Sequence, residues 1–141
     1  LFLTVGAMIE KTGHKELEHL KGIGKEMPVT LSLFLIGALS MIGIPILPGF
    51  ISKWYLALAS IRVDKLLLLG VILASSLLNA VYYLPIVING FFGEENLKGK
   101  VYKSKRKPVK EILPVIVLVM VMVYTGIVSG RIIDLIQLGI V

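Results

Sequence analysis

Three long stretches of the chain contain no charged residue and consist mainly of apolar side chains: 27–52, 66–93 and 112–130. An α-helix rises about 1.5 Å per residue, so 19 residues span about 28 Å, close to the ~30 Å hydrocarbon core of a membrane. The pattern therefore predicts membrane-spanning helices. Residues 1–9 are also apolar, but they are too short to span a membrane and predict the end of a further helix.

One segment interrupts this pattern. Pro45, Pro48 and Gly49 fall within five residues and cannot continue a regular helix. The apolar stretch after them, 50–61, covers only about 18 Å as a helix, so it spans only if the broken part also lies in the membrane. We predict an all-α integral membrane protein with a single domain over 1–141. It would have about four transmembrane helices, a partial N-terminal one, and a discontinuous helix at about 45–61.

The composition excludes several kinds of functional site. Of 141 residues 56% are hydrophobic and 17% are charged, and there is no cysteine, so disulfides, thiolate metal sites and thiol catalysis are excluded. Two histidines, His14 and His19, are too few for a histidine metal cluster, and no nucleophile–base pair is visible. We therefore expect no catalytic chemistry, no metal and no cofactor on this chain. The start at Leu1, inside an apolar run, leads us to expect a trimmed N-terminus or the tail of a longer gene.

The net charge of +6 comes mostly from 94–111. Because cytoplasmic loops of membrane proteins are rich in Lys and Arg, we expect this segment on the cytoplasmic side, and the 62–65 turn, the 10–28 loop and the C-terminus outside. The basic segment suits anionic lipid or an acidic partner subunit rather than nucleic acid. Its cations are Lys98, Lys100, Lys103, Lys105, Arg106, Lys107 and Lys110.

Lys53 is the only charged residue between positions 27 and 61. A lysine at the membrane centre costs about 2.5–3.5 kcal/mol on insertion scales, so such residues usually face a bundle interior or water. Surroundings that disfavour its charge allow it to release a proton near neutral pH and act as a relay. The alternative is a structural lysine whose head group reaches the membrane interface. Polar residues that could hold water near Lys53 are Ser40, Ser52, Ser75, Ser76 and Asn79, although such residues often only satisfy backbone groups.

These residues carry a resemblance. Met27-Pro28-Val29-Thr30, then Phe34 to Ser40 (FLIGALS), then Gly43-Ile44-Pro45 and Gly49-Phe50-Ile51-Ser52-Lys53 resemble the antiporter-like, proton-conducting membrane subunit family. That family includes pumping subunits of respiratory complex I, subunits of multisubunit cation/proton antiporters and subunits of energy-converting membrane hydrogenases. The resemblance covers most of 1–95.

The resemblance implies that Lys53 occupies the protonatable position of a terminal half-channel on a discontinuous helix. Family subunits have about fourteen helices, of which this chain would hold only the last few. The implied function is that of a membrane subunit in an H⁺- or Na⁺-translocating, redox-driven complex of the cell membrane. Its implied partners are other membrane subunits and lipid, with no soluble substrate. The alternative is a non-conducting structural subunit that bridges or seals the membrane arm.

Overall fold

The computed structural model describes residues 1–13, 21–93 and 109–138. Within these ranges the long elements are helices and no strand occurs, which confirms the all-α prediction for this part of the chain. The basic segment 94–108, His14 and His19 lie outside the described residues. The helices are α1 (Phe2–Thr12), α2 (Ile23–Glu26), α3 (Pro28–Ile42), α4 (Pro48–Arg62), α5 (Leu66–Phe92) and α6 (Val109–Leu138).

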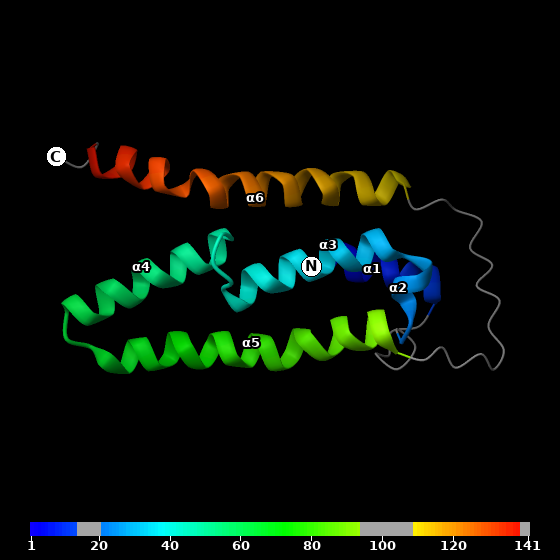
Figure 1. Cartoon of the computed structure of the whole chain (residues 1–141), viewed down its shortest axis with the longest axis horizontal. Coiled ribbons are helices and arrows are strands. Elements are labelled where there is room, and N and C mark those ends of the chain that lie inside the picture. The colour runs from blue at the N-terminus through cyan, green and yellow to red at the C-terminus, as the bar shows by residue number, and fades with distance from the viewer. Residues whose placement is uncertain (14–20, 94–108, 139–141) are drawn as a thin grey trace.

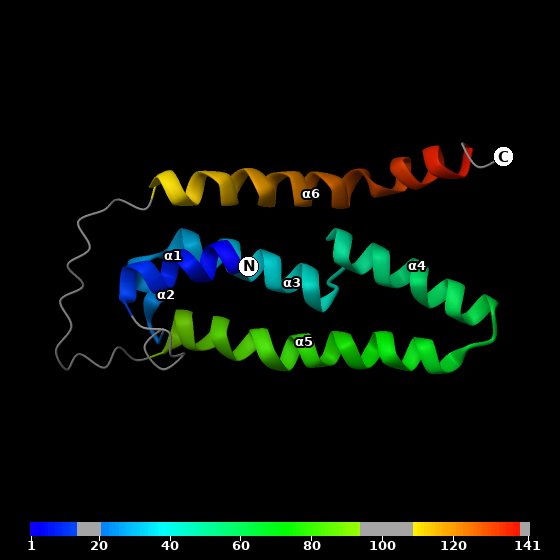
Figure 2. The same cartoon turned by 180° about the vertical axis from the view of Figure 1, so that it is seen from behind.

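Helices α3 and α4 follow one another end to end and do not fold back side by side (Figures 1 and 2). Each has 15 residues, about 22 Å of helix, whereas α5 has 27 residues, about 40 Å. Both short helices pack against α5, so together they form one pass along it. The sequence pattern predicts a span at 29–47 and a discontinuous helix at about 45–61, and in the structure the helices of these two segments follow one another in one line. The apolar residues of the break continue the hydrophobic run of α3, so the apolar stretch in the sequence is longer than the helix itself.

The described residues beside two of the predicted loops lie close together. The Gly22 amide donates a hydrogen bond to the Asn89 carbonyl at 3.0 Å, which places the start of α2 beside the last turn of α5. The end of α1, α2 and the start of α3 therefore lie at the end of the molecule where α5 runs into 94–108 (Figure 1). The prediction that the 10–28 and 94–111 loops lie on opposite sides of the membrane stays a prediction, but the described residues beside the two loops lie at the same end of the molecule.

The buried core lies at this same end, between α1, α3 and α5. Leu31, Phe34 and Ala38 of α3 are buried against Met8 of α1 and Val87 of α5. The Phe34 ring meets the ring of Tyr83 edge-on, with centroids 6.0 Å apart, a favoured aromatic geometry. Helix α6 covers the other side of the α3–α4 line and contacts α1, α3 and α4. The apolar packing thus fixes α3 firmly, while its C-terminal end points toward the break.

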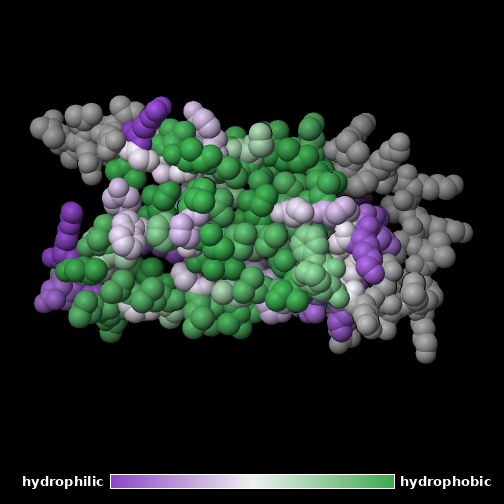
Figure 3. All heavy atoms as spheres, in the orientation of Figure 1, coloured by the Kyte–Doolittle hydropathy of each residue, from purple (hydrophilic) through white to green (hydrophobic). Residues whose placement is uncertain are grey.

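On the face that Figure 3 shows, the surface is apolar along the middle of the molecule and polar toward its two ends. Within the described residues, two helices are long and apolar enough to cross a membrane, Leu66–Phe92 and Ile112–Arg131, and Pro28–Ile42 is a shorter apolar helix. Only Val87 and Gly90 of α5 are buried, so most of its leucine and valine side chains face outward. An apolar surface of this kind suits contact with lipid or with neighbouring membrane helices, because exposing it to water is unfavourable.

Candidate functional site: a lysine in a helix break

The site is built on carbonyl groups that the end of α3 leaves without a helical donor. In a continuous helix the Met41 carbonyl would accept from the amide of residue 45, but Pro45 has no N–H. Gly43 adopts a left-handed conformation with φ 98°, and its amide and that of Ile44 both donate to the Leu39 carbonyl, at 3.0 and 3.1 Å. The Met41 and Ile42 carbonyls are thus freed at the negative end of the helix dipole.

Lys53 fills this position from the second turn of α4. Its Nζ donates to the Met41 carbonyl at 2.7 Å, to the Ile42 carbonyl at 3.3 Å and to Ser76 Oγ at 2.8 Å. An ammonium group has three N–H bonds and a neutral amine has two. The three acceptors therefore match the charged form, and loss of a proton would leave one of them without its donor.

Helix α5 contributes two polar side chains one turn apart. Ser76 Oγ accepts from Lys53 and donates its own hydrogen to the Ile72 carbonyl at 3.2 Å, which turns an oxygen lone pair toward the ammonium. Asn79 Nδ2 donates to the Met41 carbonyl at 3.2 Å. Residues three apart lie on one helix face, so Ser76 and Asn79 meet the end of α3 together.

Small residues allow the three segments to approach closely. A side chain on Gly43 would place its Cβ 3.4 Å from Lys53 Cδ. A Cβ on Gly49 would fall on the backbone carbonyl of Ser40, and one on Gly126 of α6 would fall on the carbonyl of Ile46. The helix ends and α6 are therefore in backbone contact around the break, which leaves little room for lipid or water on that side.

The break also contains a strained residue. Ile46 has a φ of 89°, in the left-handed region that a β-branched residue rarely adopts. Such a conformation costs about 1–2 kcal/mol in a non-glycine residue. Its side chain is 71% exposed, so burial of that side chain does not compensate for the strain. Contacts of the neighbouring backbone, among them the packing of Gly126 on the Ile46 carbonyl, hold the break in this shape.

The predicted site residues fall into two groups, those that meet at Lys53 and those that do not. Lys53, Ser76 and Asn79 come together, whereas Ser75 is exposed on α5. Ser52 Oγ bonds the Pro48 carbonyl within its own helix at 3.1 Å. Ser40 is buried and packs against Gly49.

The three residues predicted to break the helix lie in two different places. Pro45 lies within the break, but Pro48 and Gly49 form the first turn of α4, which runs uninterrupted to Arg62. The interruption of the helical path therefore lies at 43–47, between α3 and α4, and overlaps only the start of the predicted 45–61 segment. Proline is favourable at a helix start because the first amides have no helical acceptor. Within the described ranges 1–13, 21–93 and 109–138, no three His, Asp or Glu side chains gather as a metal site.

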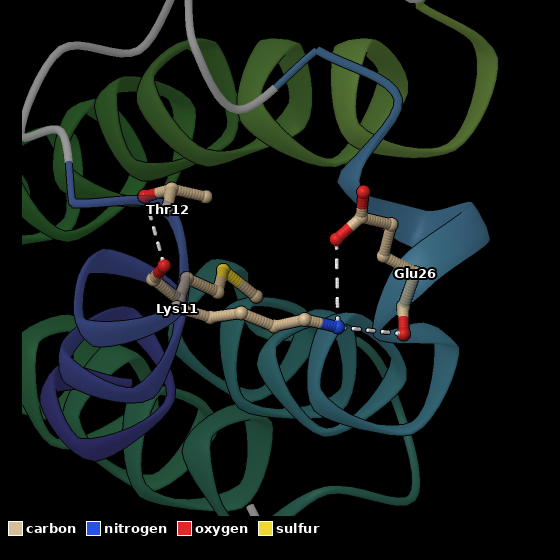
Figure 4. A network of polar contacts seen from close by, with 4 residues as sticks. Lys11, Thr12 and Glu26 are labelled. Atoms are coloured by element: carbon tan, nitrogen blue, oxygen red, sulfur yellow. Dashed lines mark hydrogen bonds and ion pairs between the residues drawn. The ribbon is translucent and has the colours of Figure 1, made fainter. Parts of the chain in front are cut away.

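A second polar contact lies far from the break, at the end where α1 and α2 meet (Figure 4). Lys11 Nζ donates to the Glu26 carbonyl at 3.2 Å and lies 3.5 Å from Glu26 Oε2. Thr12 Oγ1 donates to the Met8 carbonyl at 2.9 Å. The two charged side chains remain 24% and 29% exposed, as expected for a solvated helix end. This cluster ties α1 to α2 and has no contact with Lys53.

Comparisons with known proteins cover the whole break. The chain matches the family described as NADH:quinone oxidoreductase/Mrp antiporter, transmembrane, over residues 1–79, which includes Lys53, Ser76 and Asn79. It is 40% identical over 91 residues to NADH-quinone oxidoreductase subunit N of Desulforudis audaxviator, covering 64% of this chain and 18% of that protein. It is 35% identical over 126 residues to a Na(+)/H(+) antiporter subunit of Alkalihalophilus pseudofirmus, covering 89% of this chain and 25% of that protein.

NADH-quinone oxidoreductase subunit M of Rickettsia typhi is 30% identical over 141 residues, which cover 99% of this chain and 28% of that protein. The chain thus spans 18% to 28% of the length of these relatives. The family match covers more than half of the 141 residues and confirms the resemblance carried by the motifs around the break. The chain belongs to the NADH:quinone oxidoreductase/Mrp antiporter transmembrane family.

Proposed function

We propose that this chain is part of a membrane subunit in a multisubunit complex that translocates H⁺ or Na⁺, and that Lys53 is the protonatable group of its half-channel. Family membership and the subunit names of the relatives support the first statement. The second is carried by one observation. The Lys53 ammonium lies in a break between two half-helices and is bound to carbonyls that are free only because the helix is broken.

The proposed mechanism follows from the hydrogen-bond count. As an ammonium, Lys53 donates to all three acceptors, the Met41 and Ile42 carbonyls and Ser76 Oγ. After it passes a proton to the next carrier, the amine has one donor fewer and less attraction to the helix dipole. Protonation is thereby coupled to the position of the lysine relative to α3. Charges that change elsewhere in the complex, in a redox-driven pump during each turnover, would shift this balance and drive the cycle.

The same arrangement supports the membrane topology that we propose. α3 and α4 form one broken pass, α5 and α6 form two more, and α1 is a partial pass beside α3. The lysine-rich 94–111 segment and the α1–α3 connection lie together on the cytoplasmic side of the cell membrane, by the positive-inside rule. The 62–65 turn and the end of α6 lie on the outer side.

The exposure of the site supports further membrane subunits as partners. Lys53 and Asn79 are only partly buried and Met41 is 47% exposed, although the junction of α3 and α4 that they surround lies near the middle of the molecule's length (Figure 1). Polar backbone at this depth is tolerated where protein or a water-filled cavity covers it, and not against lipid. We propose that helices of the remaining subunit or of neighbouring subunits cover this face, and that lipid covers the apolar face of α5.

A non-conducting structural subunit is the second candidate. The contacts of Lys53 themselves favour it, because all three hydrogen bonds are internal and join α3, α4 and α5. A lysine that only closes the end of α3 would make the same bonds. The two candidates differ in what happens when the ammonium is removed while the packing is kept.

The test replaces Lys53 by Met, which keeps the length of the side chain and removes its charge, in the assembled complex. Proton or sodium uptake is measured in inverted membrane vesicles, and assembly is checked by subunit composition. Lys65→Met, at the exposed turn before α5, is the matched control. The proposal expects lost transport in Lys53→Met with assembly intact and normal transport in the control. Normal transport in Lys53→Met would refute conduction through Lys53 and favour the structural role.

A further inference from the structure

The Met41 carbonyl accepts two hydrogen bonds from two different helices. Lys53 of α4 donates at 2.7 Å and Asn79 of α5 donates at 3.2 Å. A carbonyl oxygen has two lone pairs, so both bonds form at once. The Ile42 carbonyl next to it also receives Lys53, at the longer distance of 3.3 Å. The stronger of the two Lys53–carbonyl contacts is therefore the one that Asn79 shares.

This sharing matters because Pro45 has removed the helical donor of the Met41 carbonyl. Whenever the Lys53 side chain moves away, that oxygen loses its first donor at a depth where lipid supplies none. A carbonyl left with no partner is far less stable than one that loses the second of two partners. With Asn79 in place, departure of Lys53 removes only the second bond.

We propose that Asn79 is a positioning residue that holds the Met41 carbonyl in both states of Lys53. It allows the ammonium to leave and return while the end of α3 keeps its shape. The inference rests on the proposed function, since it requires Lys53 to exchange partners during transport. An amide inside the apolar sequence Leu77-Leu78-Asn79-Ala80-Val81 is expensive unless it is bonded, which agrees with a defined task for this side chain.

The position of Asn79 distinguishes this task from general water holding. Asn79 lies three residues after Ser76, so α5 presents an acceptor for Lys53 and a substitute donor for Met41 on one face. Ser75, on an exposed part of the same helix, provides a polar residue for comparison. A residue that merely solvates the site would have no preference for the carbonyl that Pro45 exposes.

The experiment measures how often Lys53 leaves the carbonyls. The purified complex in mild detergent is treated with an amine-directed acylating reagent at one fixed pH, and the labelling rate of the Lys53 peptide is followed by mass spectrometry. Asn79→Leu, which removes the donor at similar volume, should slow this rate about fivefold or more, since departure now strands the carbonyl. Asn79→Gln restores an amide donor and should recover part of the rate. Ser75→Ala should leave the rate unchanged.

The helicity of the purified complex reports whether the fold is kept, and Asn79→Ala replaces the leucine variant if helicity falls. An unchanged or faster Lys53 rate in the folded donor-free variant overturns the inference, because another group or water would then satisfy the carbonyl. If the Lys53 labelling rate is unchanged in the Asn79 variant while Lys53→Met loses transport, only the inference about Asn79 is overturned. If labelling of Lys53 is slowed in the Asn79 variant but Lys53→Met transports normally, both the inference about Asn79 and the proposed role of Lys53 are overturned, because the motion of Lys53 would then serve no transport.

Discussion

The contact between α6 and the helix break can be tested by adding a single methyl group. Gly126→Ala would place a Cβ on the Ile46 carbonyl oxygen, with Pro48 Cδ at 3.1 Å and Leu47 Cα at 3.3 Å. All three neighbours are backbone or proline ring atoms, so no side chain can rotate out of the way. The helix α6 must shift away from the break, or the break must change its shape.

The magnitude follows from two opposing effects. Overpacking of this kind costs about 1–3 kcal/mol. Alanine favours a helix over glycine by about 1 kcal/mol, which offsets part of that cost. Gly130 lies one turn later in the same helix and has nothing within 4 Å of its added Cβ, so Gly130→Ala carries the second effect alone. We expect Gly126→Ala to be less stable than Gly130→Ala by about 1–3 kcal/mol.

The free energy of unfolding is measured by titrating the chain in mild detergent micelles with a denaturing detergent and following helicity. Trp54, the single tryptophan, supplies a second signal from α4. If Gly126→Ala proves as stable as Gly130→Ala, α6 does not lie against the break, and the packing of the site described above is refuted.

Three further outcomes follow from the same contacts. Ile46→Gly should stabilise the fold by up to about 1 kcal/mol, because relief of about 1–2 kcal/mol of strain exceeds the entropy that glycine adds to the unfolded chain; Ile46→Val, measured by the same titration, should show no gain. Ser76→Ala should raise the acylation rate of Lys53 about tenfold or more by removing one acceptor of the ammonium, and an equal rise in Ser75→Ala would contradict the assignment. Lys11→Met should lower the free energy of unfolding by at most about 1 kcal/mol, less at high salt, since the Lys11–Glu26 pair is partly exposed; a large, salt-independent loss would show that this pair is more than a surface contact.

Local sequence signals predict the parts of the site that depend on local chemistry. Pro45 marks a break and, because a helical carbonyl bonds four residues ahead, its missing N–H explains why Met41 is the acceptor left free. Lys53 stands out because it is the only charge in a long apolar run. Both Pro45 and Lys53 lie in the site as observed. The start of α3 at Pro28 and the bounds of α5 also follow from proline placement and apolar length.

Local sequence signals do not predict features that depend on contacts between residues far apart in the chain. Ser75 and Ser76 differ by one residue, about 100° of helix rotation, and only the position of α4 decides which hydroxyl meets Lys53. The end-to-end path of α3 and α4 is equally hidden, since Ile44, Ile46 and Leu47 keep the break apolar. The bond from Gly22 to Asn89, which brings the start of α2 to the end of α5, joins residues far apart in the chain.

In the proposed site, the Lys53 ammonium closes the carbonyl end of α3, and this contact holds the two half-helices together. This contact is tested most directly by solid-state NMR of the protein in lipid, with ¹⁵N at lysine Nζ and ¹³C at methionine carbonyls. A Nζ–O distance of 2.7 Å predicts strong dipolar dephasing between Lys53 and Met41 that disappears in Lys53→Met. Dephasing that is absent, or that persists in this variant, would show that Lys53 does not bind the Met41 carbonyl.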